Sequence, residues 1–206
     1  MIRWQVWAAI AGSVAAGLIL VALVSPYSVV SAVLHSPAGL SLFGRILVVY
    51  KPLYDLTGDR LLSLAAGILF TNSLTVGIVL AVPLALYATH TLGLKLKSRV
   101  RPVIAKLLLL HRTSWRAAQI AMLYTSLYLA AFTGLSIAAV ITAVKPAVFM
   151  VPETLYVALT SSVVYSAARL PYDGFTPRYL DLLKKALPAI LVLMVVSAVM
   201  EAYEII

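Results

Sequence analysis

Cysteine is absent from this chain of 206 residues, so disulfides and thiol chemistry are excluded. Charge is scarce as well, since 11% of the residues are charged and 63% are hydrophobic. A typical soluble domain has about 25% charged residues. Only 7 residues are acidic, and the net charge is +9. The basic residues cluster between apolar runs, which indicates contact with a lipid bilayer and its anionic headgroups and no nucleic-acid partner.

Long apolar runs recur five times, and a membrane-spanning helix needs about 20 such residues. We therefore expect one all-α integral membrane domain over residues 1–206, a polytopic bundle of transmembrane helices. The expected spans lie near residues 7–25, 62–90, 117–144, 147–168 and 186–204. The first run is longer than a signal-peptide core and precedes no convincing cleavage site, so we expect it to be retained.

A further apolar segment, near residues 40–53, is interrupted by Arg45 and Lys51. This mixture favours an amphipathic helix lying at the membrane interface. A re-entrant segment or a true span is the alternative.

Residues 95–116 carry seven basic residues and no acidic one. Loops rich in Lys and Arg remain in the cytoplasm. A cytoplasmic N-terminus places twelve of the 16 Lys and Arg residues inside and leaves Arg45, Lys51, Arg60 and Lys145 outside. We expect a multi-pass protein of the cell membrane with that orientation and a cytoplasmic loop at 95–116. The alternative for this loop is a docking surface for anionic lipid or an acidic partner, formed by Lys95, Lys97, Arg99 and Arg101.

Small residues recur every four positions along several spans, which places them on one helix face. Such faces let two membrane helices approach closely. The longest are Ser73, Gly77, Ala81 and Ala85, and Ser126, Ala130, Gly134, Ala138 and Thr142; shorter ones are Ala8, Gly12 and Ala16, and Ala158, Ser162 and Ser166. We expect these faces to pack on helices of the same chain or of another, which predicts a homo-oligomer or a membrane-protein partner.

Recognisable catalytic motifs are missing from the sequence. It contains no phosphate loop, dinucleotide glycine motif, His-Glu-x-x-His or Gly-x-Ser-x-Gly, and its three histidines lack metal-ligand spacing. We therefore expect neither enzymatic activity nor a cofactor or metal.

Three polar residues lie inside or at the ends of the expected spans: Asn72, Glu153 and Glu201. Polar groups in the membrane are costly, so each is a functional hypothesis. The alternatives are an interhelical hydrogen bond for Asn72 and a location at the membrane interface for the two glutamates.

At these residues the chain resembles the stage II sporulation protein M family of small polytopic membrane proteins. The similar motifs are Phe70-Thr71-Asn72, Glu153 followed by an apolar run with Ala158, and Ala198-Val-Met-Glu201. Val148 and Phe149 stand where that family usually has Pro-His. In spore-forming organisms the resemblance implies a subunit of a membrane complex that acts with cell-wall remodelling proteins during engulfment.

These patterns favour two functions over a third, an intramembrane enzyme, for which no motif gives positive support. The first is a non-enzymatic membrane protein that acts as a scaffold or as a subunit of a membrane complex. The alternative is a small transporter or channel subunit whose polar site includes Asn72, Glu153 and Glu201. Convergence of these three residues on one cavity would favour transport.

Overall fold

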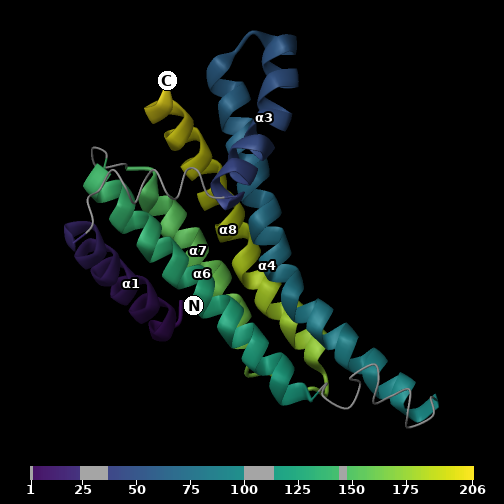
Figure 1. The fold of residues 1–206 in the computed structure, drawn as a ribbon. Coiled ribbons are helices and arrows are strands. Elements are labelled where there is room, and N and C mark those ends of the chain that lie inside the picture. Colours follow the sequence, from purple (N-terminus) through teal and green to yellow (C-terminus); the bar gives the residue numbers. More distant parts are fainter. Residues whose placement is uncertain (1, 24–36, 100–113, 144–147) are drawn as a thin grey trace.

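The computed structural model describes residues 2–23, 37–99, 114–143 and 148–206 (Figure 1). Within these ranges the regular structure is entirely helical, which confirms the predicted all-α class. The helices are α1 (Trp4–Leu23), α3 (Pro37–Thr57), α4 (Arg60–Arg99), α6 (Trp115–Ala143), α7 (Met150–Ala167) and α8 (Phe175–Ile205). Together they form a bundle from which α3 and the first part of α4 project.

Four of these helices, α1, α4, α6 and α8, are long and apolar enough to cross a membrane. They correspond to four of the five expected spans. The remaining expected span, near residues 147–168, forms α7, which is not among these four helices. Helix α7 is less apolar because its sequence combines Glu153 with several hydroxyl residues.

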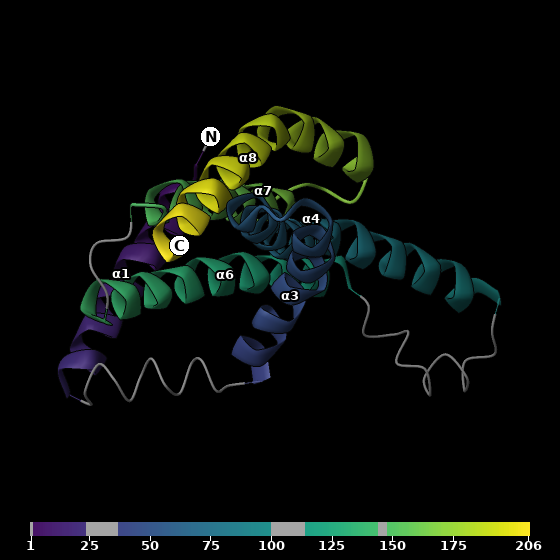
Figure 2. The same ribbon diagram turned by 90° about the horizontal axis from the view of Figure 1, so that it is seen from above.

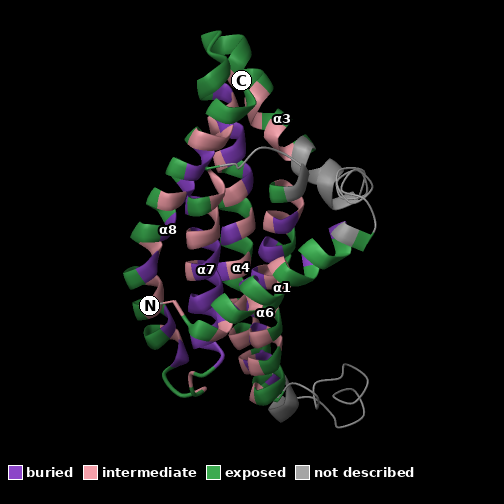
Figure 3. Ribbon diagram, turned by 90° about the vertical axis from the view of Figure 1, so that its left-hand side faces the viewer, coloured by how far each residue is buried: buried purple, intermediate pink, exposed green. Residues whose placement is uncertain are grey.

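Burial explains how α7 carries these polar residues. Of its 18 residues, 12 are buried. In α1, α4, α6 and α8, by contrast, at most 28% of the apolar stretch that could cross a membrane is buried. Figure 2 shows α7 in the middle of the bundle, and Figure 3 shows it as the most continuously buried helix. Some of its hydroxyls find partners inside the protein, as Thr160 donates to the carbonyl oxygen of Tyr156 at 2.8 Å, whereas the buried Ser161 hydroxyl has no partner in the described part of the chain. Since protein surrounds α7, its sequence does not need to match lipid.

Helices α1 and α6 pack closely through small residues. A Cβ atom added at Gly134 of α6 would collide with the Ser13 hydroxyl and the Ile10 carbonyl of α1. One added at Gly17 of α1 would lie 2.6 Å from the Cβ atom of Ala138. The two backbones therefore approach as near as the absence of side chains allows.

A helical hairpin joins α3 to α4. Gly58 turns the chain with a φ of 68°, in the left-handed region that glycine adopts without strain. The Asp59 carboxylate then accepts a hydrogen bond from the Leu62 amide at 2.9 Å and caps the start of α4. The expected amphipathic segment near residues 40–53 thus lies within α3, which runs along α4 rather than across the bundle.

Three helices extend beyond the expected spans. Helix α4 continues through Arg99, and α6 begins at Trp115, so both ends of the expected 95–116 loop are helical. Leucine, lysine and arginine are good helix formers, and a change from apolar to basic residues does not end a helix. Similarly, α8 begins at Phe175 rather than near residue 186, because Pro177 lies in its first turn, where proline is tolerated.

Candidate functional site

The expected intramembrane glutamates lie where α7 begins and α8 ends. Glu204, one turn beyond Glu201, accepts hydrogen bonds from the amides of Val148 at 2.9 Å and Phe149 at 3.4 Å. These amides precede the first turn of α7, where backbone N–H groups have no partner within the helix. A carboxylate from α8 therefore caps the start of α7.

Glu153 and Glu201 are both half-buried at the contact between α7 and α8. They lie close enough to interact electrostatically with each other and with Tyr156. Nearby, the Ser197 hydroxyl of α8 donates to the Phe149 carbonyl at 3.4 Å. This group of polar residues joins the two helices at one end of the bundle.

Asn72 lies on α4 and is half-buried, one turn after Ile68, which packs against Ala198 and Ala202 of α8. Its neighbour Thr71 is buried and donates to the Gly67 carbonyl at 3.0 Å. No hydrogen bond in the described part of the chain joins Asn72 to Glu153 or Glu201. Within residues 2–23, 37–99, 114–143 and 148–206, no group of three or more His, Asp and Glu side chains is placed to hold a metal ion.

The two longest small-residue faces have different surroundings. On α6, Ser126, Ala130, Gly134 and Ala138 are all buried. The Ser126 hydroxyl also donates to the Ser161 carbonyl of α7 at 2.7 Å.

On α4, by contrast, the small-residue face is exposed along its whole length. A Cβ atom added at Gly77 would meet nothing within 4 Å. The exposed residues are Ser73, Gly77, Ala81 and Ala85.

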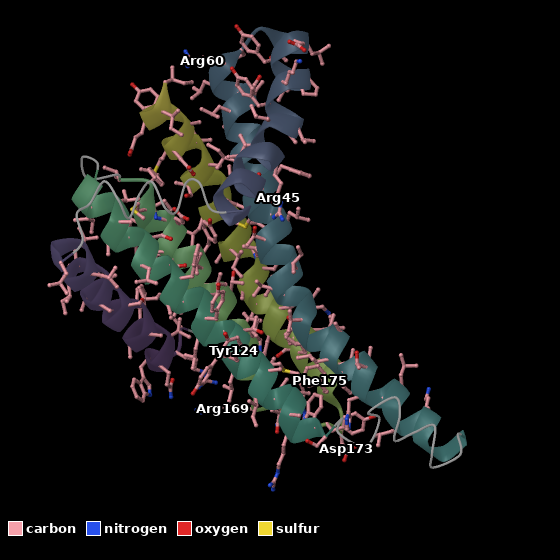
Figure 4. All side chains as sticks on the ribbon, viewed as in Figure 1. Arg45, Arg60, Tyr124, Arg169, Asp173 and Phe175 are labelled. Carbon is pink, nitrogen blue, oxygen red and sulfur yellow. The ribbon has the colours of Figure 1, made fainter. Side chains whose placement is uncertain are left out.

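Basic residues gather where α4 and α7 end and where α6 and α8 begin; we call this the basic end of the bundle. Arg169 lies there near Asp173 and Phe175, whereas Arg60 lies at the opposite end (Figure 4). Of the expected docking residues, Lys95 is exposed, Lys97 and Arg99 belong to the last turns of α4, and Arg101 lies outside the described residues.

A cluster of aromatic rings at the basic end was not foreseen from the sequence. Phe175 packs with ring centroids 5.0 Å from Trp115, 5.1 Å from Tyr87 and 5.7 Å from Tyr179. His90 and Tyr172 complete the aromatic cluster, with centroids 5.0 Å apart.

Hydrogen bonds hold this aromatic cluster to the surrounding backbone. The Trp115 indole and the Gln119 amide both donate to the Leu170 carbonyl at 3.2 Å. The Tyr179 hydroxyl donates to the Leu80 carbonyl at 2.5 Å. The aromatic cluster therefore joins α4, α6, α8 and the link between α7 and α8.

Two pockets flank α7. The first, of about 270 Å³, is lined by Ile2, Arg3, Leu159, Ser162, Val163, Ser166, Leu182 and Ala186. The second, of about 370 Å³, is lined by Trp7, Ile137, Ile141, Met150, Val151, Thr154 and Leu155. Neither pocket is lined by Asn72, Glu153 or Glu201, so these three residues do not converge on either one.

A scan against family models, a search of curated proteins and a search of solved structures each found no match to this chain.

Proposed function

We propose that the chain is a polytopic integral membrane protein that works by association, as a scaffold or as a subunit of a membrane complex. The observation that carries this proposal is the exposed small-residue face of α4. A face of this composition favours close contact with another helix, and α6 uses the same kind of face to bind α1. The occupant would be a helix of a second copy or of a partner protein.

Filling this face is expected to disrupt assembly. Gly77→Leu places a large side chain where a partner backbone would approach, and overpacking of this kind costs about 1–3 kcal/mol. We expect association to weaken by about tenfold or more. Native gel electrophoresis of membranes solubilised in mild detergent would show a shift toward the monomer of 22.1 kDa.

The matched control is Ala189→Leu, at an exposed position of α8 outside any small-residue face. This variant is expected to keep the parent's assembly size. A parent protein that runs as a monomer, or a Gly77→Leu variant that assembles as the parent does, would refute association through this face.

The proposed topology has five spans, with α7 as the fifth, and a cytoplasmic N-terminus. Its support is the uneven distribution of basic residues along the bundle: Lys95, Arg116, Arg169 and Arg178 lie at the basic end, while Arg60 lies at the other. The positive-inside rule then places the basic end in the cytoplasm.

Single-cysteine labelling tests this orientation directly, because the chain has no cysteine of its own. An impermeant maleimide added to intact cells is expected to label Tyr203→Cys and to leave Asp173→Cys unlabelled until the cells are lysed. Both positions are exposed. Labelling of Asp173→Cys before lysis would reverse the proposed orientation.

The resemblance to the stage II sporulation protein M family is compatible with association, since it implies a complex subunit. A transporter or channel subunit is less well supported. Its expected polar site required Asn72, Glu153 and Glu201 to converge on one cavity, and none of the three lines either of the two pockets beside α7.

A further inference from the structure

Arg3 is fixed in place by two serines of α7. Its backbone amide donates to the Ser162 hydroxyl oxygen at 3.0 Å, and its Nε atom donates to the Ser166 hydroxyl oxygen at 3.1 Å. Only 3% of Ser162 and 8% of Ser166 is exposed. In Figure 3 the first residues cross in front of α7 toward α8. Arg3 is exposed, and its guanidinium group lies at the wall of the first pocket.

The positive charge of Arg3 is not balanced within the described ranges. No carboxylate there forms an ion pair with it, and its two terminal Nη atoms have no hydrogen-bond partner among those residues. Arginine presents its N–H donors in a planar fork that matches phosphate and carboxylate oxygens.

The two serines have spare donors as well. Elsewhere in these helices a hydroxyl commonly donates to the carbonyl four residues earlier, as Thr160 does to Tyr156. Ser162 and Ser166 instead accept from Arg3, and no donation by either hydroxyl is found in the described part of the chain. Their O–H groups and the Nη atoms thus remain as donors on one side of the pocket. Such a set of donors suits an anion.

The rest of the first pocket is apolar. Ile2, Leu159, Val163, Leu182 and Ala186 complete its lining. Its volume of about 270 Å³ lies near the lower limit of roughly 300 Å³ for ligand sites. A ligand that combines an anionic head with an apolar body fits this division better than a free inorganic ion does.

One face of α7 leads from this pocket to the second. Ser166, Ser162, Leu159, Leu155 and Val151 follow one another at spacings of three or four residues, which places them on one side of the helix. The rise from Ser166 to Val151 is about 22 Å at 1.5 Å per residue. Half of a bilayer's hydrocarbon core is about 15 Å thick, so this face is long enough for an acyl chain of one leaflet.

We propose that the first pocket binds an anionic phospholipid. Arg3, Ser162 and Ser166 hold its phosphate, and an acyl chain lies along Leu159 and Leu155 toward the second pocket. This site is separate from the expected docking residues of the 95–101 segment. It does not depend on association through α4.

Titration of the purified chain in detergent micelles tests the site, with native mass spectrometry as the readout. The probes are dioctanoyl phosphatidylglycerol, dioctanoyl phosphatidylcholine and inorganic phosphate. We expect one phosphatidylglycerol to bind per chain, with phosphatidylcholine and phosphate binding more weakly. Arg3→Gln is expected to weaken phosphatidylglycerol binding by about ten- to a hundredfold, the value of a hydrogen bond to a charged group.

Two further variants make the result decisive. Arg178→Gln removes an exposed arginine of the same end that does not line the pocket, and it is expected to retain the parent affinity. Leu182→Trp fills the pocket from a half-buried position of α8 without changing any charge, and it is expected to lose binding as Arg3→Gln does. This variant decides the question even if Arg3→Gln folds poorly.

Three outcomes would overturn the proposal. The first is equal phosphatidylglycerol affinity for the parent and Leu182→Trp. The second is equal weakening by Arg3→Gln and Arg178→Gln, which would indicate attraction by net charge alone. The third is inorganic phosphate binding as tightly as phosphatidylglycerol, which would make the pocket a site for a free anion.

Discussion

Replacing Gly134 by leucine is expected to destabilise the bundle by about 3 kcal/mol, the upper part of the usual range for overpacking. Even a single Cβ atom at this position would collide with the Ser13 hydroxyl and the Ile10 carbonyl, and it would lie 3.1 Å from the Ser13 Cβ atom. The Ile10 carbonyl belongs to the helix backbone and the Ser13 hydroxyl to a short side chain, so neither can move far. Helix α1 must therefore separate from α6.

Equilibrium unfolding in mixed micelles measures this loss. The matched control is Gly12→Leu, on α1 but on its exposed side, where an added Cβ atom meets nothing within 4 Å. Its effect should stay within about 1 kcal/mol, the difference expected from helix propensity. Similar unfolding free energies for the two variants would refute the close contact between α1 and α6.

Truncating Phe175 to alanine is expected to cost about 3–5 kcal/mol, as for other fully buried aromatic residues. Phe175 is 0% exposed and stands at the centre of the aromatic cluster, in contact with the rings of Tyr87, Trp115 and Tyr179. The cavity left behind is bounded by four segments of the chain. Because hydrogen bonds also hold these segments, they are poorly able to close it.

The same unfolding assay applies, with Phe70→Ala as the control. Phe70 is 44% exposed on α4, so its truncation leaves no comparable cavity. We expect an effect below about 1 kcal/mol for the control. If Phe175→Ala unfolds as the control does, the aromatic cluster does not hold the basic end together.

Helix positions followed from the sequence because apolar runs of sufficient length are an unambiguous signal. The sequence did not show which face of each helix is covered by other helices. The expected face of α1, Ala8, Gly12 and Ala16, is exposed, while Ser13 and Gly17 contact α6. Spacing identifies residues that share a face, but a small-residue face can pack against a helix of the same chain or of another. Only the three-dimensional arrangement decides whether the chain supplies that partner.

The candidate sites, too, could be predicted only in part. Glu153 and Glu201 stood out because carboxylates are rare inside apolar runs. Their proximity depends on the antiparallel course of α7 and α8, which brings residues about 50 positions apart to one level. Arg3 gave no signal, since a single arginine before a first span is ordinary. Its significance comes from the serines of α7, more than 150 residues later.

The enclosed position of α7 has a consequence for biogenesis. A segment with Glu153, Pro152 and four Ser or Thr residues from Thr160 to Ser166 gains little from leaving the translocon for lipid by itself. Its Thr154 and Thr160 hydroxyls bond within the helix, but its polar residues are shielded from lipid only once neighbouring helices are present. Insertion of α7 is therefore expected to await α8, so that the two enter the bilayer as a helical pair. A nascent chain truncated before α8 should then leave α7 accessible to water, although the complete protein buries it.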